Sequence, residues 1–253
     1  MKLSTLLRKK SYQTDRESPS EKIPKEMRQS KAAEEDDLPP ELIDALEGDK
    51  DKSGPNLEDL GIYYLRGEIN ERNISPIVTS ILEKDLTSFP GEIMLFINSP
   101  GGDASEMWSL IDVLHSTRLP VTTIGMGLIA SAAAMIVSAG DPGRRFVMPR
   151  TEIMVHPFSA GTIGTIHQMK ADMKGMVIEY ERFVKFWLAH SRYKNRRELE
   201  RHLLKITDNY MSARQAMKHG IIDGIVQDQR TNKLRALRKQ EKKVVKKKKK
   251  KVP

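Results

Sequence analysis

The chain has 253 residues, enough for one sizeable hydrophobic core, with a net charge of +9 and no cysteine. The lack of cysteine excludes disulfides, thiol nucleophiles and thiolate metal sites, and fits a reducing compartment. The positive charge is concentrated in residues 230–253, which contain thirteen Lys and Arg and one Glu. Because the remainder is weakly acidic, a folded nucleic-acid-binding surface is disfavoured.

Composition divides the chain into three parts. Residues 1–56 are polar, charged and poor in aromatics, which predicts a disordered extension that could serve as a propeptide. Residues 57–229 carry the apolar patterns of one folded domain. Residues 230–253 are predicted to be a disordered, solvated Lys-rich tail; contact of this tail with nucleic acid or an acidic partner is the less favoured alternative.

The sequence contains no stretch typical of export or membrane insertion. The start, "MKLSTLLRKKSYQ", has too few apolar residues for a secretory signal. The longest run of small apolar residues, 126–140, is shorter than the about 20 residues that cross a bilayer. We therefore expect a cytoplasmic protein with no membrane contact, and an organelle matrix is the minor alternative.

The apolar patterns of the first half predict strands and helices in alternation. "IYYLRGEI" (62–69), "EIMLFINS" (92–99) and "VTTIGM" (121–126) are typical of strands. Apolar residues at helical spacing predict an amphipathic helix before the third strand: Met107, Leu110, Ile111 and Leu114. Strand, helix and strand in this order imply an α/β fold with a largely parallel sheet and crossover helices.

The second half continues the alternation. A short helix of small residues ends at Gly140, and the strand "TEIMVH" (151–156) follows it. Methionine and aromatic residues between 169 and 188 predict a long helix with a wide apolar face. Ser212 and Gln215 have capping-box spacing in a helix that Gly220 ends, before the strand "IIDGIV" (221–226).

Three polar side chains follow predicted strands or precede helices, where catalytic groups often lie. Ser131 begins a helix, whose first N–H groups lack partners and would stabilise an oxyanion. His156 could activate this serine as a base, and Asp208 could hold the imidazole in the required tautomer. The turn "SPGG" (99–102) lets a backbone N–H approach a ligand.

Each of these residues also has an ordinary structural interpretation. Ser131 could be a packing residue, His156 the end of a strand and Asp208 the end of a helix. We interpret the other five histidines as surface residues. The sequence lacks the G-x-S-x-G, phosphate-loop and H-E-x-x-H motifs, so no metal or nucleotide site is predicted.

Four motifs in register resemble the Clp protease proteolytic subunit family: "FINSPGGDAS", "GMGLIASAAAM", "IMVHPFSAGTIG" and "DNYMSARQAMKHGIIDGIV". The resemblance covers about residues 62–226 and implies a Clp protease and crotonase-like fold with a protruding handle helix. It implies Ser131 as nucleophile, His156 as general base and Asp208 as its orienting acid. It also implies an oxyanion hole formed by the N–H groups of Gly102 and Ala132.

The resemblance further implies a serine endopeptidase that cuts unfolded polypeptides to short peptides inside a homo-oligomeric ring. The ring would be heptameric, with a stacked double ring as one option. An AAA+ unfoldase partner would use ATP, and this chain would need no cofactor. Met94 and Phe96 stand where the family has the apolar cleft for that partner.

Two alternatives remain open at this point. The chain could be a catalytically idle structural subunit of a ring, because Thr207 replaces an arginine that is common in the family. It could also be another crotonase-fold enzyme, such as an acyl-CoA enzyme or a signal-peptide peptidase. The complete Ser, His and Asp set argues against both.

Overall fold

The computed structural model of the protein describes residues 56–233. The predicted extension, apart from residue 56, and residues 234–253 of the tail lie outside the described residues. The elements, in chain order, are β1 (Ile62–Arg66), α3 (Glu71–Leu86), β2 (Ile93–Ser99), α4 (Ala104–Ser116), β3 (Val121–Ala130), α5 (Ala132–Ser138), β4 (Arg145–Val147), β5 (Glu152–Val155), α6 (Ile166–His190), α7 (Arg196–His202), β6 (Asn209–Ser212), α8 (Ala213–His219) and β7 (Gly224–Ile225).

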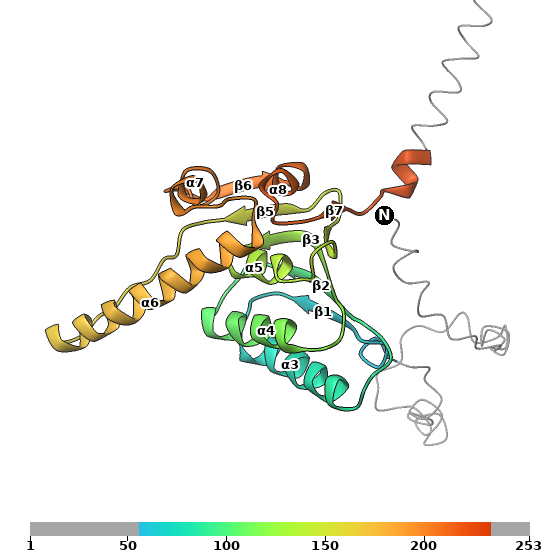
Figure 1. Ribbon diagram of the computed structural model, residues 1–253, viewed down its shortest axis with the longest axis horizontal. Helices are drawn as coiled ribbons and strands as arrows, with labels where there is room; N and C mark the ends of the chain where they lie inside the picture. Colours follow the sequence, from blue (N-terminus) through green and yellow to red (C-terminus); the bar gives the residue numbers. More distant parts are fainter. Residues whose placement is uncertain (1–55, 234–253) are drawn as a thin grey trace, which may run out of the picture.

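The strands form one seven-stranded sheet (Figure 1). Its main path runs β1-β2-β3-β4-β7, and β5 and β6 branch from it because the long strand β3 pairs with both β4 and β5. Every pairing is parallel except that of β5 with β6. The α/β class with a largely parallel sheet is thus confirmed.

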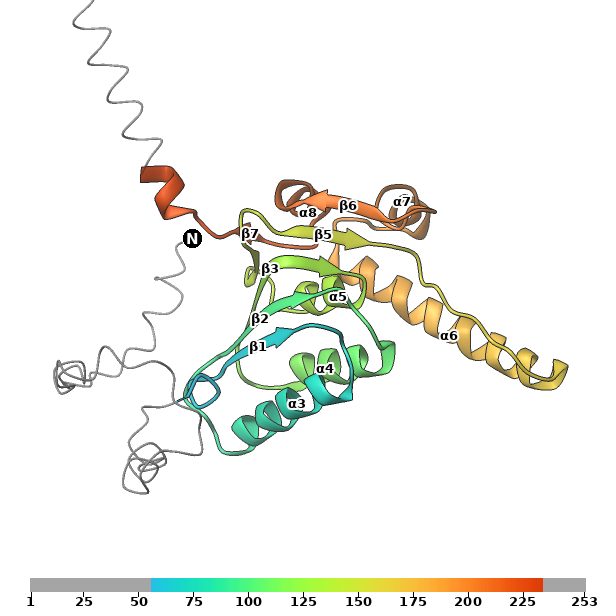
Figure 2. The same cartoon turned by 180° about the vertical axis from the view of Figure 1, so that it is seen from behind.

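One face of the sheet carries the main hydrophobic core. Figures 1 and 2 show α3, α4 and α5 together on this face of β1, β2 and β3. The predicted apolar stripe of α4 is fully buried there, and α5 is buried along its whole length. This packing holds the amino-terminal end of α5, where Ser131 lies, in a fixed position.

The helix α3 was not predicted. Pro76 lies inside it, where proline normally interrupts a helix, although Ile74, Ile77 and Ile81 are buried at helical spacing. Asn70 begins the helix, and its side chain accepts a hydrogen bond from the Asn73 N–H at 3.2 Å. The sequence also gave no prediction for α7, β4 or β6.

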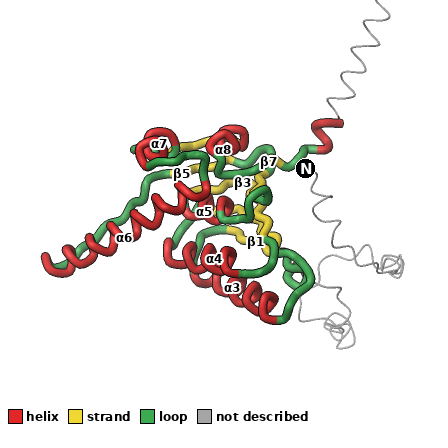
Figure 3. The backbone as a smooth tube through the Cα atoms, in the orientation of Figure 1, coloured by secondary structure: helices red, strands yellow, loops and turns green. Residues whose placement is uncertain are grey.

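The long helix α6 extends away from the sheet, as the resemblance implied (Figures 1 and 2). Its carboxyl-terminal half packs on the core through Val184, Phe186 and Trp187. Its amino-terminal half exposes apolar side chains, among them Met173 at 60%. The chain between β5 and α6 is loop rather than strand (Figure 3).

Candidate active site

Ser131 lies at the sharp turn that joins β3 to α5. Its φ of 57° and ψ of −123° form a backbone conformation that costs a non-glycine residue about 1–3 kcal/mol. The Ser131 N–H donates to the Met154 carbonyl at 2.9 Å, which ties the turn to β5. The Ser131 side chain makes no capping bond to α5, so its hydroxyl is available to another group.

That other group is His156, which directly follows β5. Its Nε2 lies 2.7 Å from Oγ of Ser131, and its Nδ1 lies 2.6 Å from the carbonyl oxygen of Pro157. Because a carbonyl oxygen can only accept, the geometry fits the neutral tautomer in which Nδ1 donates to Pro157 and Nε2 accepts from the serine hydroxyl. This is the tautomer that a general base requires.

Asp208 directly precedes β6, on the neighbouring strand. Val155 pairs with Asn209 in the antiparallel ladder, so one further step places Asp208 opposite His156. The Asp208 side chain is exposed, however, and within residues 56–233 it makes no hydrogen bond or ion pair. The structure therefore brings Ser131 and His156 together, and it leaves Asp208 nearby without the expected bond to Nδ1.

Two backbone N–H groups at the site have no partner. Ile69 forms a β-bridge with the glycine turn through the residues on either side of Gly102: the Ile69 N–H donates to the Gly101 carbonyl at 2.9 Å, and the Asp103 N–H donates to the Ile69 carbonyl at 2.8 Å. The Gly102 N–H takes no part in this bridge. The N–H of Ala132, the first residue of α5, has no acceptor inside the helix. Across the described residues neither group makes a hydrogen bond. Both can therefore donate to an oxyanion.

The predicted partner cleft needs correction at one of its two residues. Met94 is completely buried, in a small cluster on the sheet face opposite the helices, where it is grouped with Phe146 and Val226. A partner cannot reach Met94 in this conformation. Phe96, two residues further along β2, is half-buried at the edge of the same cluster and remains accessible.

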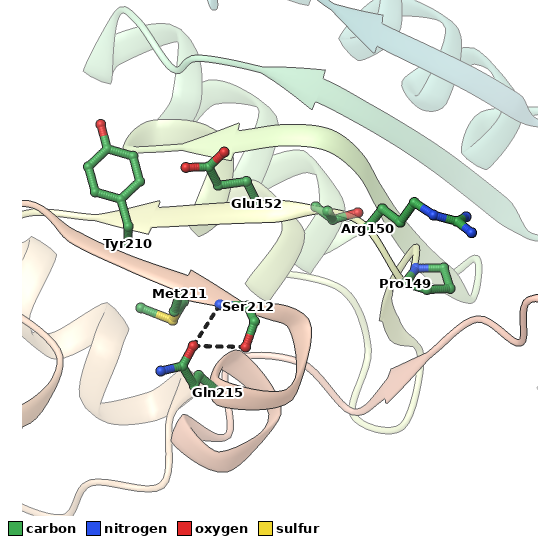
Figure 4. A pocket seen from close by; sticks show the side chains of 8 residues that line it. Pro149, Arg150, Glu152, Tyr210, Met211, Ser212 and Gln215 are labelled. Atoms are coloured by element: carbon green, nitrogen blue, oxygen red, sulfur yellow. Dashed lines mark hydrogen bonds between the residues drawn. The ribbon is translucent and has the colours of Figure 1, made fainter.

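A cavity of about 390 Å³ lies along β5 and β6, close to the site but separate from it (Figure 4). Neither Ser131 nor His156 lines it. Figure 4 shows Ser212 bonded to Gln215, whose side-chain oxygen accepts from the Ser212 N–H at 2.9 Å and from its hydroxyl at 2.8 Å. The lining residues are Pro149, Arg150, Thr151, Glu152, Tyr210, Met211, Ser212 and Gln215.

Residues 56–233 contain neither a metal-binding cluster nor a membrane-spanning helix. No group of three or more His, Asp or Glu side chains could hold a metal ion. No helix there has both the length and the apolar character needed to cross a bilayer.

Sequence reasoning missed the contact between His156 Nδ1 and the Pro157 carbonyl. A backbone carbonyl is present at every residue, so the role of Pro157 has no signature in the residue types. The contact of Phe158 with Phe183 on α6, with ring centroids 6.2 Å apart, was also missed.

Comparison with known proteins agrees with the geometry. Residues 52–229 match the sequence model of the family described as Clp protease. The ATP-dependent Clp protease proteolytic subunit of Ligilactobacillus salivarius is 29% identical over 169 residues, which cover 67% of this chain and 84% of that protein. The chloroplastic proteolytic subunit 4 of Arabidopsis thaliana is 34% identical over 166 residues, or 65% of this chain and 56% of that protein.

A third relative, the ATP-dependent Clp protease proteolytic subunit of Leuconostoc citreum, is 31% identical over 167 residues, or 65% of this chain and 82% of that protein. The matched region contains the whole folded domain, including the serine at the strand-to-helix turn and the histidine bonded to it. The chain therefore belongs to the Clp protease family and is a serine-type peptidase.

Proposed function

We propose that this chain is a serine endopeptidase subunit that cuts unfolded polypeptides to short peptides inside an oligomeric chamber. The observation that supports this most strongly is the 2.7 Å contact between Ser131 Oγ and His156 Nε2, with Nδ1 of the same ring held as a donor. A serine hydroxyl is a weak nucleophile alone, and a neutral imidazole in this position activates it.

The proposed reaction has two halves. His156 Nε2 takes the Ser131 proton as Oγ attacks the peptide carbonyl carbon, and the oxyanion accepts hydrogen bonds from the Gly102 and Ala132 N–H groups. The imidazolium then gives its proton to the leaving amine, and the acyl-serine ester remains. His156 next takes a proton from water, the resulting hydroxide attacks the ester, and the proton returns to Ser131 as the peptide acid leaves.

Asp208 is proposed to support the imidazolium that forms in both halves. Its place opposite His156 in the strand register supports this role, since a carboxylate close to the ring favours the charged form. Apart from the attacking water, the proposed reaction uses only side chains and backbone groups of this chain. ATP, in this proposal, is used by an AAA+ unfoldase that docks over the apolar edge containing Phe96.

A ring assembly is supported by the exposed face of α6. Met169, Met173 and Val177 are four residues apart and project from a helix that stands away from its own domain. Apolar side chains in such a row favour burial against another subunit. Seven subunits in each ring, and two stacked rings, are the arrangement that we propose by analogy with the family.

The proposal is tested by intact-mass spectrometry after reaction with a fluorophosphonate. An activated serine displaces fluoride, so we expect one phosphonyl adduct that maps to Ser131 and is absent in Ser131→Ala and in His156→Ala. Ser138→Ala is the matched control, because the Ser138 hydroxyl donates to the Ala134 carbonyl at 2.8 Å inside the same helix. An assembled sample with no adduct would instead identify a structural, idle ring subunit.

A further inference from the structure

A groove of about 550 Å³ lies between the start of α8, β7 and the turn that joins β4 to β5. It adjoins the cavity of Figure 4 and shares Pro149, Arg150 and Ser212 with it. Neither Ser131 nor His156 lines this groove. It is therefore a surface separate from the candidate active site.

The groove combines apolar and positively charged side chains. Its apolar part contains Ala213 and Val226, which are buried, and Ile225, which is half-buried. Two arginines with exposed side chains, Arg150 and Arg214, also line it. This combination suits a ligand that has an apolar side and carries negative charge.

Arg214 is the charge that the domain leaves uncompensated. Arg150 donates from Nη2 to Oδ2 of Asp228 at 2.8 Å, so its charge is already paired. Arg214 makes no hydrogen bond or ion pair within residues 56–233. An acidic ligand in the groove would thus find a guanidinium available for a charge-assisted hydrogen bond.

A segment of matching chemistry precedes the described residues. Residues 34–51 contain nine Asp and Glu and one Lys. Within them "PPELIDALEG" (39–48) has proline before and glycine after a short run, which is typical of helix ends. Its large apolar residues fall on one side of such a helix: Leu42, Ile43 and Leu46. Its acidic residues fall on the other side: Glu41, Asp44 and Glu47.

The described chain starts close to the groove. Leu60 packs against the small cluster that includes Val226, and Val226 also lines the groove. Glu47 precedes Asn56, the first described residue, by nine residues. A stretch of that length spans up to about 30 Å when extended, so residues 41–47 can reach the groove without rearrangement of the domain.

We propose that residues 41–47 of this chain dock in the groove, with their apolar side on Ile225 and Val226 and their acidic side chains near Arg214. Ordering a short segment costs conformational entropy, and attachment to the same chain offsets this cost because it raises the effective concentration to the millimolar range. The inference goes beyond the proposed function and does not depend on it, since the groove contains no residue of the active site.

Disulfide trapping tests this contact directly, because the chain has no cysteine of its own. The full-length chain carries Ser131→Ala, so that any self-cleavage is prevented and the extension is retained. It also carries Ala45→Cys and Gln227→Cys, the second at an exposed position that lines the groove. We expect an intrachain disulfide to form at least about 10-fold faster than with Ala171→Cys, an exposed position on α6, in place of Gln227→Cys.

Charge variants of the trapped pair separate specific docking from random encounter. Arg214→Glu should slow disulfide formation about fivefold, as expected for loss of an exposed ion pair. Adding Glu41→Lys, Asp44→Lys and Glu47→Lys to Arg214→Glu should restore the rate, because the charges are again opposite. Arg201→Glu is the matched control: Arg201 is an exposed arginine on α7 that does not line the groove, and its replacement should leave the rate unchanged.

Four results would overturn the inference. They are equal rates in Arg214→Glu and Arg201→Glu, no preference for Gln227→Cys over Ala171→Cys, a disulfide that forms only between two chains, and faster pairing of Ala45→Cys with Val244→Cys in the Lys-rich tail. The last would mean that the tail, and not the groove, holds the acidic segment. Fluorophosphonate labelling of Ser131 tests the proposed function in a separate sample, so either idea can fail without the other.

Discussion

Gly101 lies so close to Ser131 that position 101 has no room for a side chain. A Cβ on Gly101 would lie 2.9 Å from the Cβ of Ser131 and 2.7 Å from the carbonyl oxygen of Ala130. Gly101 also has a φ of 99°, which side-chain-bearing residues rarely adopt. The glycine turn after β2 and the serine turn after β3 can therefore approach this closely only because position 101 has no side chain.

Gly101→Ala should strongly reduce the rate of serine labelling. The methyl group would push the turn away from Ser131 and displace the adjacent Gly102 N–H from the oxyanion position. Loss of one such donor typically costs about 10²–10³-fold in kcat, so we expect at least that reduction in the rate of labelling or peptide hydrolysis. Gly143→Ala is the control, with a φ of 84° and no atom within 4 Å of an added Cβ. A similar loss in both variants would attribute the effect to general backbone strain.

Because Met173 lies on the exposed apolar face of α6, we predict that assembly into the oligomer depends on this side chain. Met173→Glu places a charge where an apolar partner surface is proposed, so the sedimentation profile should move from a large oligomer toward smaller species. Ala171→Glu introduces the same side chain at an exposed position on the opposite side of the helix, and it should leave the profile unchanged. If both variants sediment like the wild type, α6 does not form the subunit contact.

The sequence was most informative where the residue type and the spacing of apolar residues in strands or helices indicate the same local structure. The strand, serine and helix order around Ser131 predicted the turn, and a histidine at a strand end predicted its partner. Gly220 adopts the left-handed cap expected of it, with a φ of 74°. These features are local, so short segments of sequence contain them.

The features that the sequence did not reveal depend on packing between distant segments. Met94 was expected to line a partner cleft because it stands where the family has that cleft, yet a position in a motif does not say what covers the side chain. The buried cluster that encloses Met94 includes Phe146 and Val226, which come 52 and 132 residues later in the chain. Likewise the bond from His156 to a backbone carbonyl could not be read from residue types.

The burial of Met94 can be tested through the free energy of unfolding of variants at this position. Met94→Ala should lower the free energy of unfolding by about 2–5 kcal/mol, because it removes a fully buried side chain and leaves a cavity. Met173→Ala removes the same atoms from a side chain that is 60% exposed, and should change the free energy of unfolding by no more than about 0.5 kcal/mol in a dissociated subunit. Urea titration of both variants provides the comparison. A small effect at Met94 would instead indicate an accessible side chain, as the predicted partner cleft requires.

His190 corrects the prediction that the remaining histidines are surface residues. Its ring is half-buried, stacks on Phe186 at 4.0 Å and on His115 at 5.2 Å, and donates from Nδ1 to the Phe186 carbonyl at 2.9 Å. Burial lowers the pKa of His190 below its usual value of 6.5, and the charges of His115 and Arg145 act in the same direction, against the bond to Phe186. The folded protein therefore disfavours protonation of this ring.

This pKa shift predicts loss of stability in mild acid. Since the pKa is lower in the folded than in the unfolded chain, the unfolded chain binds more protons below about pH 6.5. The free energy of unfolding should be constant with respect to His190 above that pH and should fall as the pH drops toward the folded pKa. His190→Phe, which keeps a ring on Phe186, should flatten this slope in urea titrations from pH 7.5 to 5.5. The slope should not vanish, because burial also lowers the pKa of His219. An unchanged slope in His190→Phe would mean that other groups take up the protons.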